Sequence, residues 1–265
     1  MTIARILVIA GSDSSGGAGI QADIRTITML GAHPMTAITA VTAQNTQGVQ
    51  GVHMLPADFV VTQAQSCIAD IGVDAVKIGM LGAPDIAHAV ADLLETLRVP
   101  IVFDPVMVAT SGAVLADAET IAGFERLMAL AALTTPNLPE LEALGGEAVL
   151  REKTRALLIK GGHATGPHIE NRLIQGGGET VFVSPRIDTR HTHGTGCTLA
   201  SGIAAGLGAG MDLRAATGRA IRFVEQAIAH VPGLGRGGGP LGHAMGGVPF
   251  DATRPIGDQG LAGGS

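Results

Sequence analysis

A glycine-rich hexapeptide carries residue types that are suited to chemistry. Its sequence is THGTGC, at residues 192–197. The small residues that follow, 198–209, predict a packed helix. A helix start offers unpaired N–H groups and the positive end of the helix dipole, both of which favour an anion. A thiol just inside such a start has a lowered pKa, so we expect Cys197 to act as a base or nucleophile near neutral pH. The alternative is a glycine-rich turn followed by a small buried cysteine.

Other polar residues end or follow the expected strands. The loop 12–19 follows the first strand, 6–10, and the single residues of this kind are Gln44, Asp104, Asn137 and Lys160. Ligands bind outside the carboxyl ends of the strands in open α/β sheets. We therefore expect these residues to share one site with the hexapeptide.

Each of these residues also has a purely structural interpretation. The sequence from Asn137 to Glu140 matches a helix capping box. Asp104 precedes a proline and fits a turn, and Lys160 precedes two glycines and fits a solvated strand end. The loop 12–19 lacks both the P-loop pattern and the dinucleotide fingerprint.

Three histidines lie in this part of the chain, His163, His191 and His193. They lack the spacing of a closed zinc site. His193 is the one within the hexapeptide, and we expect it to form hydrogen bonds and not to bind a metal.

Taken together, these residues favour phosphoryl transfer. That reaction needs charge neutralisation and positioning more than covalent chemistry. An anion-binding helix start, a base in Cys197, the cation of Lys160 and oxygen ligands on Asp104 and Glu140 supply these parts. Mg²⁺ prefers carboxylates, water and substrate phosphates, so the two carboxylates could serve it.

The elements that position these residues alternate between short apolar strands and helices. This alternation predicts an α/β fold in three layers, with a mostly parallel sheet flanked by helices on both faces. The segments 169–174 and 180–183 predict a hairpin. We expect one domain over residues 1–244 and a disordered tail over 245–265, which is rich in Gly.

The composition narrows the class of protein. Of 265 residues, 46% are hydrophobic, 15% charged and 2% aromatic, which provides a core of aliphatic side chains. A net charge of −6 without blocks of like charge argues against nucleic acid or an anionic membrane as partner. The two cysteines, Cys67 on an expected core face and Cys197, fit a reducing, cytoplasmic location. No apolar stretch approaches the roughly 20 residues of a membrane span.

Seven blocks of the sequence, in this order, resemble the hydroxymethylpyrimidine/phosphomethylpyrimidine kinases of thiamine biosynthesis. They are GSDSSGGAGIQAD at 11–23, TAVTAQNT at 39–46, KIGML at 77–81, DPVM at 104–107, TPNLPE at 135–140, KGGH at 160–163 and THGTGC at 192–197. The resemblance covers about residues 5–243. It implies the ribokinase-like fold, ATP as donor, and a pyrimidine alcohol that is phosphorylated to the monophosphate and then to the diphosphate. It also implies a homodimer.

The resemblance further implies roles for individual residues. Cys197 would be the catalytic base, and the N–H groups of Gly194, Thr195, Gly196 and Cys197 would form the anion hole. Gln44 would pair with the pyrimidine edge. The other residues implied in that pocket are Asp23, Gly11, Met80 and Val106. Lys160, Asn137 and Thr192 would lie at the nucleotide, and Asp104 and Glu140 would support Mg²⁺.

The sequence departs from the family in three places. The segment 141–159 is shorter than usual, so we expect the helix before the Lys160 strand to be missing or truncated and the nucleotide side to be looser. Thr110 stands where Lys is common, and the tail after about Val248 has no counterpart.

Two alternatives remain at this point. One is a pyridoxal or pyridoxine kinase of vitamin B6 salvage, although the amide of Gln44 suits an aminopyrimidine better because it both donates and accepts hydrogen bonds. The other is a ligand-binding relative with weakened catalysis. The joint presence of Lys160, Asp104, Glu140 and Cys197 argues against that second alternative.

Overall fold

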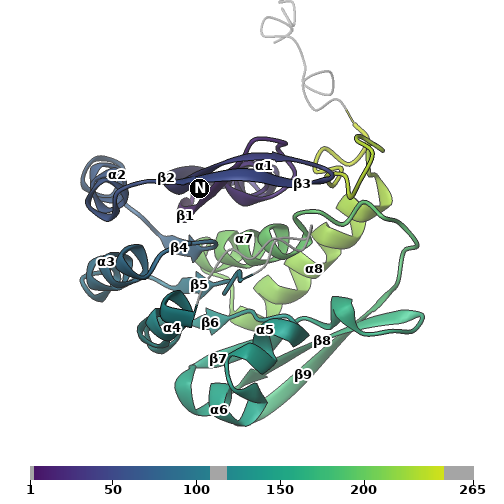
Figure 1. Ribbon diagram of the computed structural model, residues 1–265. Helices are drawn as coiled ribbons and strands as arrows, with labels where there is room; N and C mark the ends of the chain where they lie inside the picture. The colour runs from purple at the N-terminus through teal and green to yellow at the C-terminus, as the bar shows by residue number, and fades with distance from the viewer. Residues whose placement is uncertain (1–2, 108–117, 248–265) are drawn as a thin grey trace, which may run out of the picture.

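A nine-stranded sheet runs through the part of the chain that the computed structural model describes, residues 3–107 and 118–247 (Figure 1). Its strand order is β3-β2-β1-β4-β5-β6-β7-β8-β9. The six strands from β2 to β7 along this order are parallel, and β3, β8 and β9 are antiparallel at the two edges. The strands are β1 (Arg5–Asp13), β2 (His33–Asn45), β3 (Gly48–Met54), β4 (Ala75–Ile78), β5 (Ile101–Phe103), β6 (Leu133–Thr134), β7 (Ala156–Ile159), β8 (His168–Gln175) and β9 (Gly178–Pro185). The mostly parallel sheet predicted from the sequence is confirmed.

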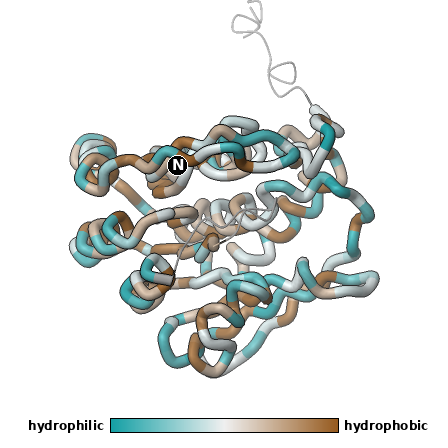
Figure 2. The backbone as a smooth tube through the Cα atoms, viewed as in Figure 1, coloured by the Kyte–Doolittle hydropathy of each residue, from teal (hydrophilic) through white to brown (hydrophobic). Residues whose placement is uncertain are grey.

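The central strand β1 shows why the sequence forms this sheet. Its apolar residues are buried on both faces, with Ile6 and Val8 in one hydrophobic cluster and Leu7 and Ile9 in the other. A parallel strand covered on both faces is a continuous hydrophobic run, and Figure 2 shows such brown segments between the helices.

The helices form two outer layers (Figure 1). One face is covered by α2 (Ala57–Asp70), α3 (Pro84–Glu95), α4 (Ala118–Leu130), α5 (Leu138–Ala143) and α6 (Gly146–Lys153). The other face is covered by α1 (Gly19–Met29), α7 (Thr195–Gly208) and α8 (Leu213–Ala229). These three layers confirm the predicted fold class.

The shortened segment 141–159 keeps a helix. α6 has eight residues, and its Leu150 is fully buried in the core. Of the two outcomes that we expected, a missing or a truncated helix, the first is excluded because a short, two-turn helix remains. The reason is that Gly145 and Gly146, both with positive φ, turn the chain sharply enough to start α6 straight after α5.

The structure bears on several further predictions from the sequence. The predicted hairpin is confirmed as β8 and β9, and Cys67 packs against the core as expected. Thr110 and residues 248–265 lie outside the described residues. In the described ranges, no helix combines the length and apolar character that crossing a membrane requires.

The helix that bears the hexapeptide is held by close packing against α8. A Cβ atom added to Gly206 of α7 would lie 2.8 Å from the Cβ of Ala216 and 3.2 Å from its Cα. Real Cβ contacts are essentially never so short, so the two helices approach this closely because residue 206 is glycine.

We predict that Gly206→Ala lowers the free energy of unfolding by about 1–3 kcal/mol, because the added methyl group forces α7 and α8 apart. Gly218→Ala on α8 is the matched control, since its added Cβ would meet the far edge of the Phe182 ring at 3.3 Å. The control should be neutral or gain up to about 1 kcal/mol from helix propensity. Urea unfolding midpoints measure both. Equal midpoints for the two variants would contradict this account of the packing.

Candidate active site

A cavity of about 940 Å³ opens at the carboxyl edge of the sheet. It extends from the end of β1, past the start of α7, to α8. Nearly all of the predicted site residues line it: Gly11, Gln44, Met80, Asp104, Val106, Asn137, Glu140, Lys160, Thr192, Gly194, Thr195, Gly196 and Cys197. The predicted gathering of strand-end residues in one place is therefore observed.

Asp23 is the exception. Its side chain is fully buried in α1, and it is absent from the cavity wall. Both of its carboxylate oxygens accept hydrogen bonds from Lys77 Nζ, at 3.0 and 2.9 Å, and Ser201 Oγ donates to it at 2.6 Å. The pocket role that the resemblance implied for Asp23 does not fit this position, because the carboxylate is already engaged behind the wall.

The start of α7 is built for close approach. Gly194 is its N-cap, with φ +90°. A Cβ atom on Gly194 would overlap the carbonyl oxygen of Gly17, and one on Gly17 would overlap the ring of His193. Within the described structure no side chain caps this helix, so its first N–H groups are left without side-chain acceptors. This first turn can hold an anion.

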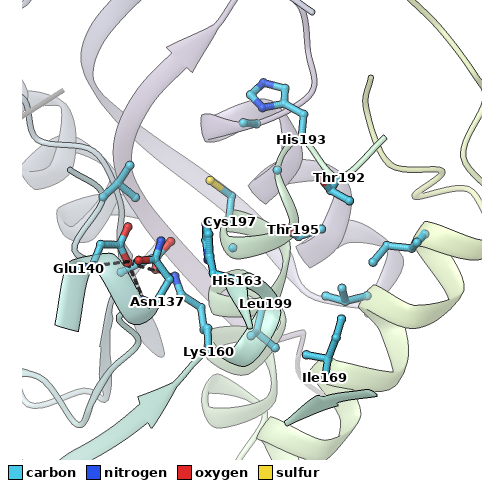
Figure 3. A pocket seen from close by; sticks show the side chains of 18 of the residues that line it. Asn137, Glu140, Lys160, His163, Ile169, Thr192, His193, Thr195, Cys197 and Leu199 are labelled. Carbon is cyan, nitrogen blue, oxygen red and sulfur yellow. Dashed lines mark hydrogen bonds and ion pairs between the residues drawn. The ribbon is translucent and has the colours of Figure 1, made fainter. Parts of the chain in front are cut away.

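Cys197 lies in the first turn of α7 at the middle of the cavity, between His193 and the group formed by Asn137, Glu140 and Lys160 (Figure 3). We expected the helix start to lower the pKa of its thiol. Instead burial raises that pKa to about 11, and Asp23 and Asp104 also raise it while Lys77 lowers it. The expectation of a thiolate near neutral pH is thus wrong, because desolvation outweighs the interactions that lower this pKa.

Lys160 forms ion pairs with the carboxylates of Asp104 and Glu140. Its Nζ lies 2.6 Å from Asp104 Oδ1 and 3.6 Å from Glu140 Oε2. Burial would lower the pKa of Lys160, but the two carboxylates raise it to about 12. A Cβ atom on Gly196 would lie 3.4 Å from Lys160 Nζ and 3.6 Å from Asp104 Oδ2. The cation therefore sits directly beside the anion-binding turn.

Glu140 combines a structural role with a place in the site. It forms the predicted capping box of α5: Asn137 Oδ1 accepts from the Glu140 N–H at 2.9 Å, and Glu140 Oε2 accepts from the Asn137 N–H at 2.8 Å. Burial, and then the charge of Asp104, raise the pKa of Glu140 despite the opposing effect of Lys160. The structural interpretation of this motif is confirmed, and the same side chains still line the cavity.

Asp104 and Glu140 offer the donor set that Mg²⁺ prefers. They are two nearly buried carboxylates beside one cavity. Burial first, and the charge of Asp104 second, raise the pKa of Glu140, so a further cation beside the two carboxylates would favour its ionised form. Over residues 3–107 and 118–247, no three His, Cys, Asp or Glu side chains form a metal-binding group. Mg²⁺ here would complete its coordination with water and substrate phosphates.

A second polar group lies at the opposite end of the cavity. Its parts are Asp13, His193 and Gln44: His193 Nε2 lies 2.9 Å from Asp13 Oδ2 and 3.2 Å from Gln44 Nε2. Thr42 Oγ1 donates to Gln44 Oε1 at 3.2 Å. The hydrogen-bonding role expected of His193 is observed. Thr42 holds the Gln44 amide at the cavity wall, because His193 Nε2 already donates to Asp13 and cannot also accept from the Gln44 N–H.

Sequence reasoning missed two residues of this region. Asp13 organises the loop after β1, because its carboxylate accepts from the N–H groups of Ser15, Gly17 and Ala18. Lys77 forms part of the cavity floor. The sequence did indicate a special role for Lys77, since the charge of a lysine inside the apolar strand β4 requires a buried partner.

One wall of the cavity, beyond Lys160, is aliphatic. The aliphatic side chains that line it come from β8, the segment before α7, α7 itself and α8: Ile169, Ile187, Leu199, Ile221, Val224 and Ile228. Such a wall suits a flat, uncharged ring. It was not predicted, because these residues are scattered over four elements.

The pKa of Asp13 gives a prediction about stability. Burial would raise this pKa, but hydrogen bonds from His193, Ser15 and backbone N–H groups lower it to about 2. Asp13→Asn should therefore cost about 2 kcal/mol of unfolding free energy at pH 7. The ionised Asp13 stabilises the fold above its unfolded pKa near 4, and this contribution is lost as the pH falls towards 2. Urea unfolding at pH 7 and pH 3 should show a smaller gap from wild type at pH 3.

The matched control for this prediction is Asp70→Asn, at the exposed end of α2, which should change stability by less than about 0.5 kcal/mol at both pH values. A gap for Asp13→Asn that is the same at pH 7 and pH 3 would contradict the account.

Comparisons with known proteins identify the family of this chain. A family model described as phosphomethylpyrimidine kinase matches residues 13–242. The chain is 45% identical to the hydroxymethylpyrimidine/phosphomethylpyrimidine kinase of Streptomyces coelicolor, over 90% of this chain and 93% of that protein. It is 47% identical to the thiamine biosynthesis bifunctional protein ThiED of Geobacter sulfurreducens, over 91% of this chain, and spans about half (52%) of that longer relative.

A solved structure shares the fold closely. The ADP complex of Bacillus subtilis pyridoxal kinase superposes with a TM-score of 0.85 and 31% sequence identity, covering 92% of this chain and 98% of that one. The ribokinase-like fold predicted from the sequence is thereby confirmed. On the family model and the sequence identities, the chain belongs to the phosphomethylpyrimidine kinase family.

Proposed function

We propose that this protein transfers a phosphoryl group from ATP to 4-amino-5-hydroxymethyl-2-methylpyrimidine, and then a second one to the resulting monophosphate, in thiamine biosynthesis. One observation carries the proposal. A single cavity joins an amide-lined end at Gln44, an uncapped helix start at Gly194–Cys197 and a cationic group at Lys160. The names of the relatives support the same activity.

The pyrimidine is proposed to bind at the end that Gln44 lines. A side-chain amide can donate to and accept from the edge of an aminopyrimidine. Gly11 suits a flat ring because it brings backbone close to the ligand, and Met80 and Val106 add apolar walls. The hydroxymethyl group would then point towards Cys197.

ATP is proposed to lie across the other end. Its base would rest on the aliphatic wall between Ile169 and Ile228, and its phosphates would reach Lys160, with Thr192 and Asn137 alongside. The pKa of Lys160, raised to about 12, keeps this side chain cationic at neutral pH. Mg²⁺ held by Asp104 and Glu140 would neutralise phosphate charge when it is bound.

The transfer step is proposed to centre on the first turn of α7. The alcohol oxygen attacks the γ-phosphorus, the bond from that phosphorus to the bridging oxygen breaks, and ADP leaves. The N–H groups of Gly194 to Cys197 stabilise the transferring phosphoryl oxygens. Cys197 Sγ, in its thiolate form, accepts the alcohol proton.

The two transfers differ in their need for a general base. The acceptor of the second transfer is a phosphate monoester, whose oxygens are already ionised at neutral pH because the second pKa is near 6. No proton has to be removed from that nucleophile. The first transfer should therefore depend on Cys197 much more than the second.

A second candidate function is the phosphorylation of pyridoxal. The similarity to the Bacillus subtilis pyridoxal kinase, at a TM-score of 0.85, favours it. The sequence identity with the pyrimidine kinases is higher, at 45% against 31%, and this favours the pyrimidine. A non-catalytic binding role is disfavoured because Lys160, Asp104, Glu140 and Cys197 all line one cavity. The homodimer and the cytoplasmic location stay predictions.

The test of the function is phosphoryl transfer from ATP, with Mg²⁺, to hydroxymethylpyrimidine and to pyridoxal in parallel, with products resolved by mass. We expect the mono- and diphosphorylated pyrimidine, and a lower kcat/KM for pyridoxal. Product from pyridoxal alone would make the protein a vitamin B6 kinase, and no product from either would favour the binding protein.

Cys197→Ala should lower kcat for the first transfer by about 10²–10⁴-fold, because the general base is lost. Pyrimidine affinity and the second transfer should change far less. Since the pKa of Cys197 is raised to about 11, the wild-type first transfer should also accelerate as the pH rises from 7 to 10, and the variant should lack this dependence. Single-turnover assays with each acceptor measure these rates. Equal loss in both transfers, or none in the first, would contradict the proposed role.

A further inference from the structure

Lys77 is a fully buried lysine that the proposed mechanism leaves without a role. It is among the largest side chains of the described structure with no exposed surface, and it lies within the otherwise apolar strand β4. Its Nζ donates to both carboxylate oxygens of Asp23, which is fully buried as well. Burying such a pair costs much of what the attraction returns, so stability alone does not account for it.

The pair is oriented with respect to the cavity. Lys77 contributes to the cavity floor, whereas Asp23 lies behind it on α1. Ser201, one turn along α7 from Cys197, donates to Asp23 Oδ1 at 2.6 Å. The pair is thus anchored to the helix that carries the thiol, with its ammonium nearer the cavity.

Four charged groups act electrostatically on Cys197, and three of them, Lys77, Asp104 and Lys160, line the same cavity as its thiol. Lys77 comes from β4, Asp23 from α1, Asp104 from the end of β5 and Lys160 from the end of β7. Lys77 lowers the pKa of the thiol, as does the Gly19 N–H, while Asp23 and Asp104 raise it. Lys77 and Asp23 therefore act on the thiol in opposite directions.

We propose that the Lys77–Asp23 ion pair is a positioning element that sets the balance between thiol and thiolate at Cys197. The ammonium of Lys77 stabilises the thiolate of Cys197. Asp23 holds that ammonium in place and limits its effect on the thiolate. This inference rests on the role of Cys197 in the proposed function. According to this proposal, an ion pair that does not touch the substrate controls the availability of Cys197 as a base.

Lys77 and Asp23 shift the pKa of Cys197 in opposite directions, and this difference can be tested. Iodoacetamide alkylates the thiolate, so the rate of Cys197 alkylation, followed between pH 7 and 11 by mass spectrometry of peptides, reports its ionisation. Lys77→Met should move the midpoint upwards and slow alkylation at pH 8.5, and Asp23→Asn should move it downwards and speed alkylation. Each pKa unit corresponds to about a tenfold change in rate below the midpoint.

Three controls separate charge from loosened packing. The double variant Lys77→Met/Asp23→Asn restores neutrality and should alkylate within about threefold of wild type. Ser201→Ala removes a hydrogen bond to Asp23 without changing any charge and should shift the midpoint less than either single variant. Cys67, alkylated in the same protein, reports general unfolding. If Lys77→Met fails to fold, Asp23→Asn and the double variant still carry the test.

Opposite shifts in the two single variants would support the proposal. Shifts in the same direction, or unchanged midpoints, would overturn it, because a purely structural pair alters access to the thiol and not its ionisation. Alkylation needs neither ATP nor an alcohol. Shifted midpoints in a protein that phosphorylates neither acceptor would therefore refute the proposed function alone, and unchanged midpoints in an active kinase would refute the ion-pair proposal alone.

Discussion

The close contact between the loop after β1 and the start of α7 determines where everything else in the site lies. Gly17 and Gly194 leave no space between the two segments, and a Cβ atom at either position would overlap the other segment. This contact points the uncapped first turn of α7 into the cavity and sets His193 against Asp13. The tight packing of α7 on α8 then holds the helix in that position.

Around this turn, buried charges are arranged so that each has a partner. Lys160 is placed between Asp104 and Glu140, and Lys77 is paired with Asp23. Two largely buried cations thus lie near the helix start, and burial strengthens their electrostatic interactions. The same burial disfavours the thiolate of Cys197. The two cations therefore suit the charge of a phosphate, whereas Cys197, the proposed base, is held mainly in its protonated form.

Much of this site could be predicted from the sequence because parallel strands end at one edge. Gln44 lies at the end of β2, and Asp104 and Lys160 directly follow β5 and β7, so their positions along the strands bring them together. The layered fold followed from the alternation of elements. The capping box between Asn137 and Glu140 was also visible, since it is a local pattern.

What the sequence did not reveal depends on packing between distant segments. The raised pKa of Cys197 results from burial and from carboxylates on other elements. Neither cause is visible in the sequence around the start of α7. The position of Asp23 behind the cavity wall depends on its pairing with Lys77, 54 residues away. The aliphatic wall of the cavity combines side chains from separate elements, and α6 required two consecutive positive-φ glycines.

The central claim is that one cavity holds the pyrimidine alcohol and the nucleotide on either side of the first turn of α7. A crystal structure with hydroxymethylpyrimidine, Mg²⁺ and a non-hydrolysable ATP analogue tests it most directly. We predict the hydroxyl oxygen within hydrogen-bond distance of Cys197 Sγ, and the γ-phosphate on the N–H groups of Gly194 to Cys197. A γ-phosphate bound away from that turn, or a pyrimidine without contact to Gln44, would contradict the account.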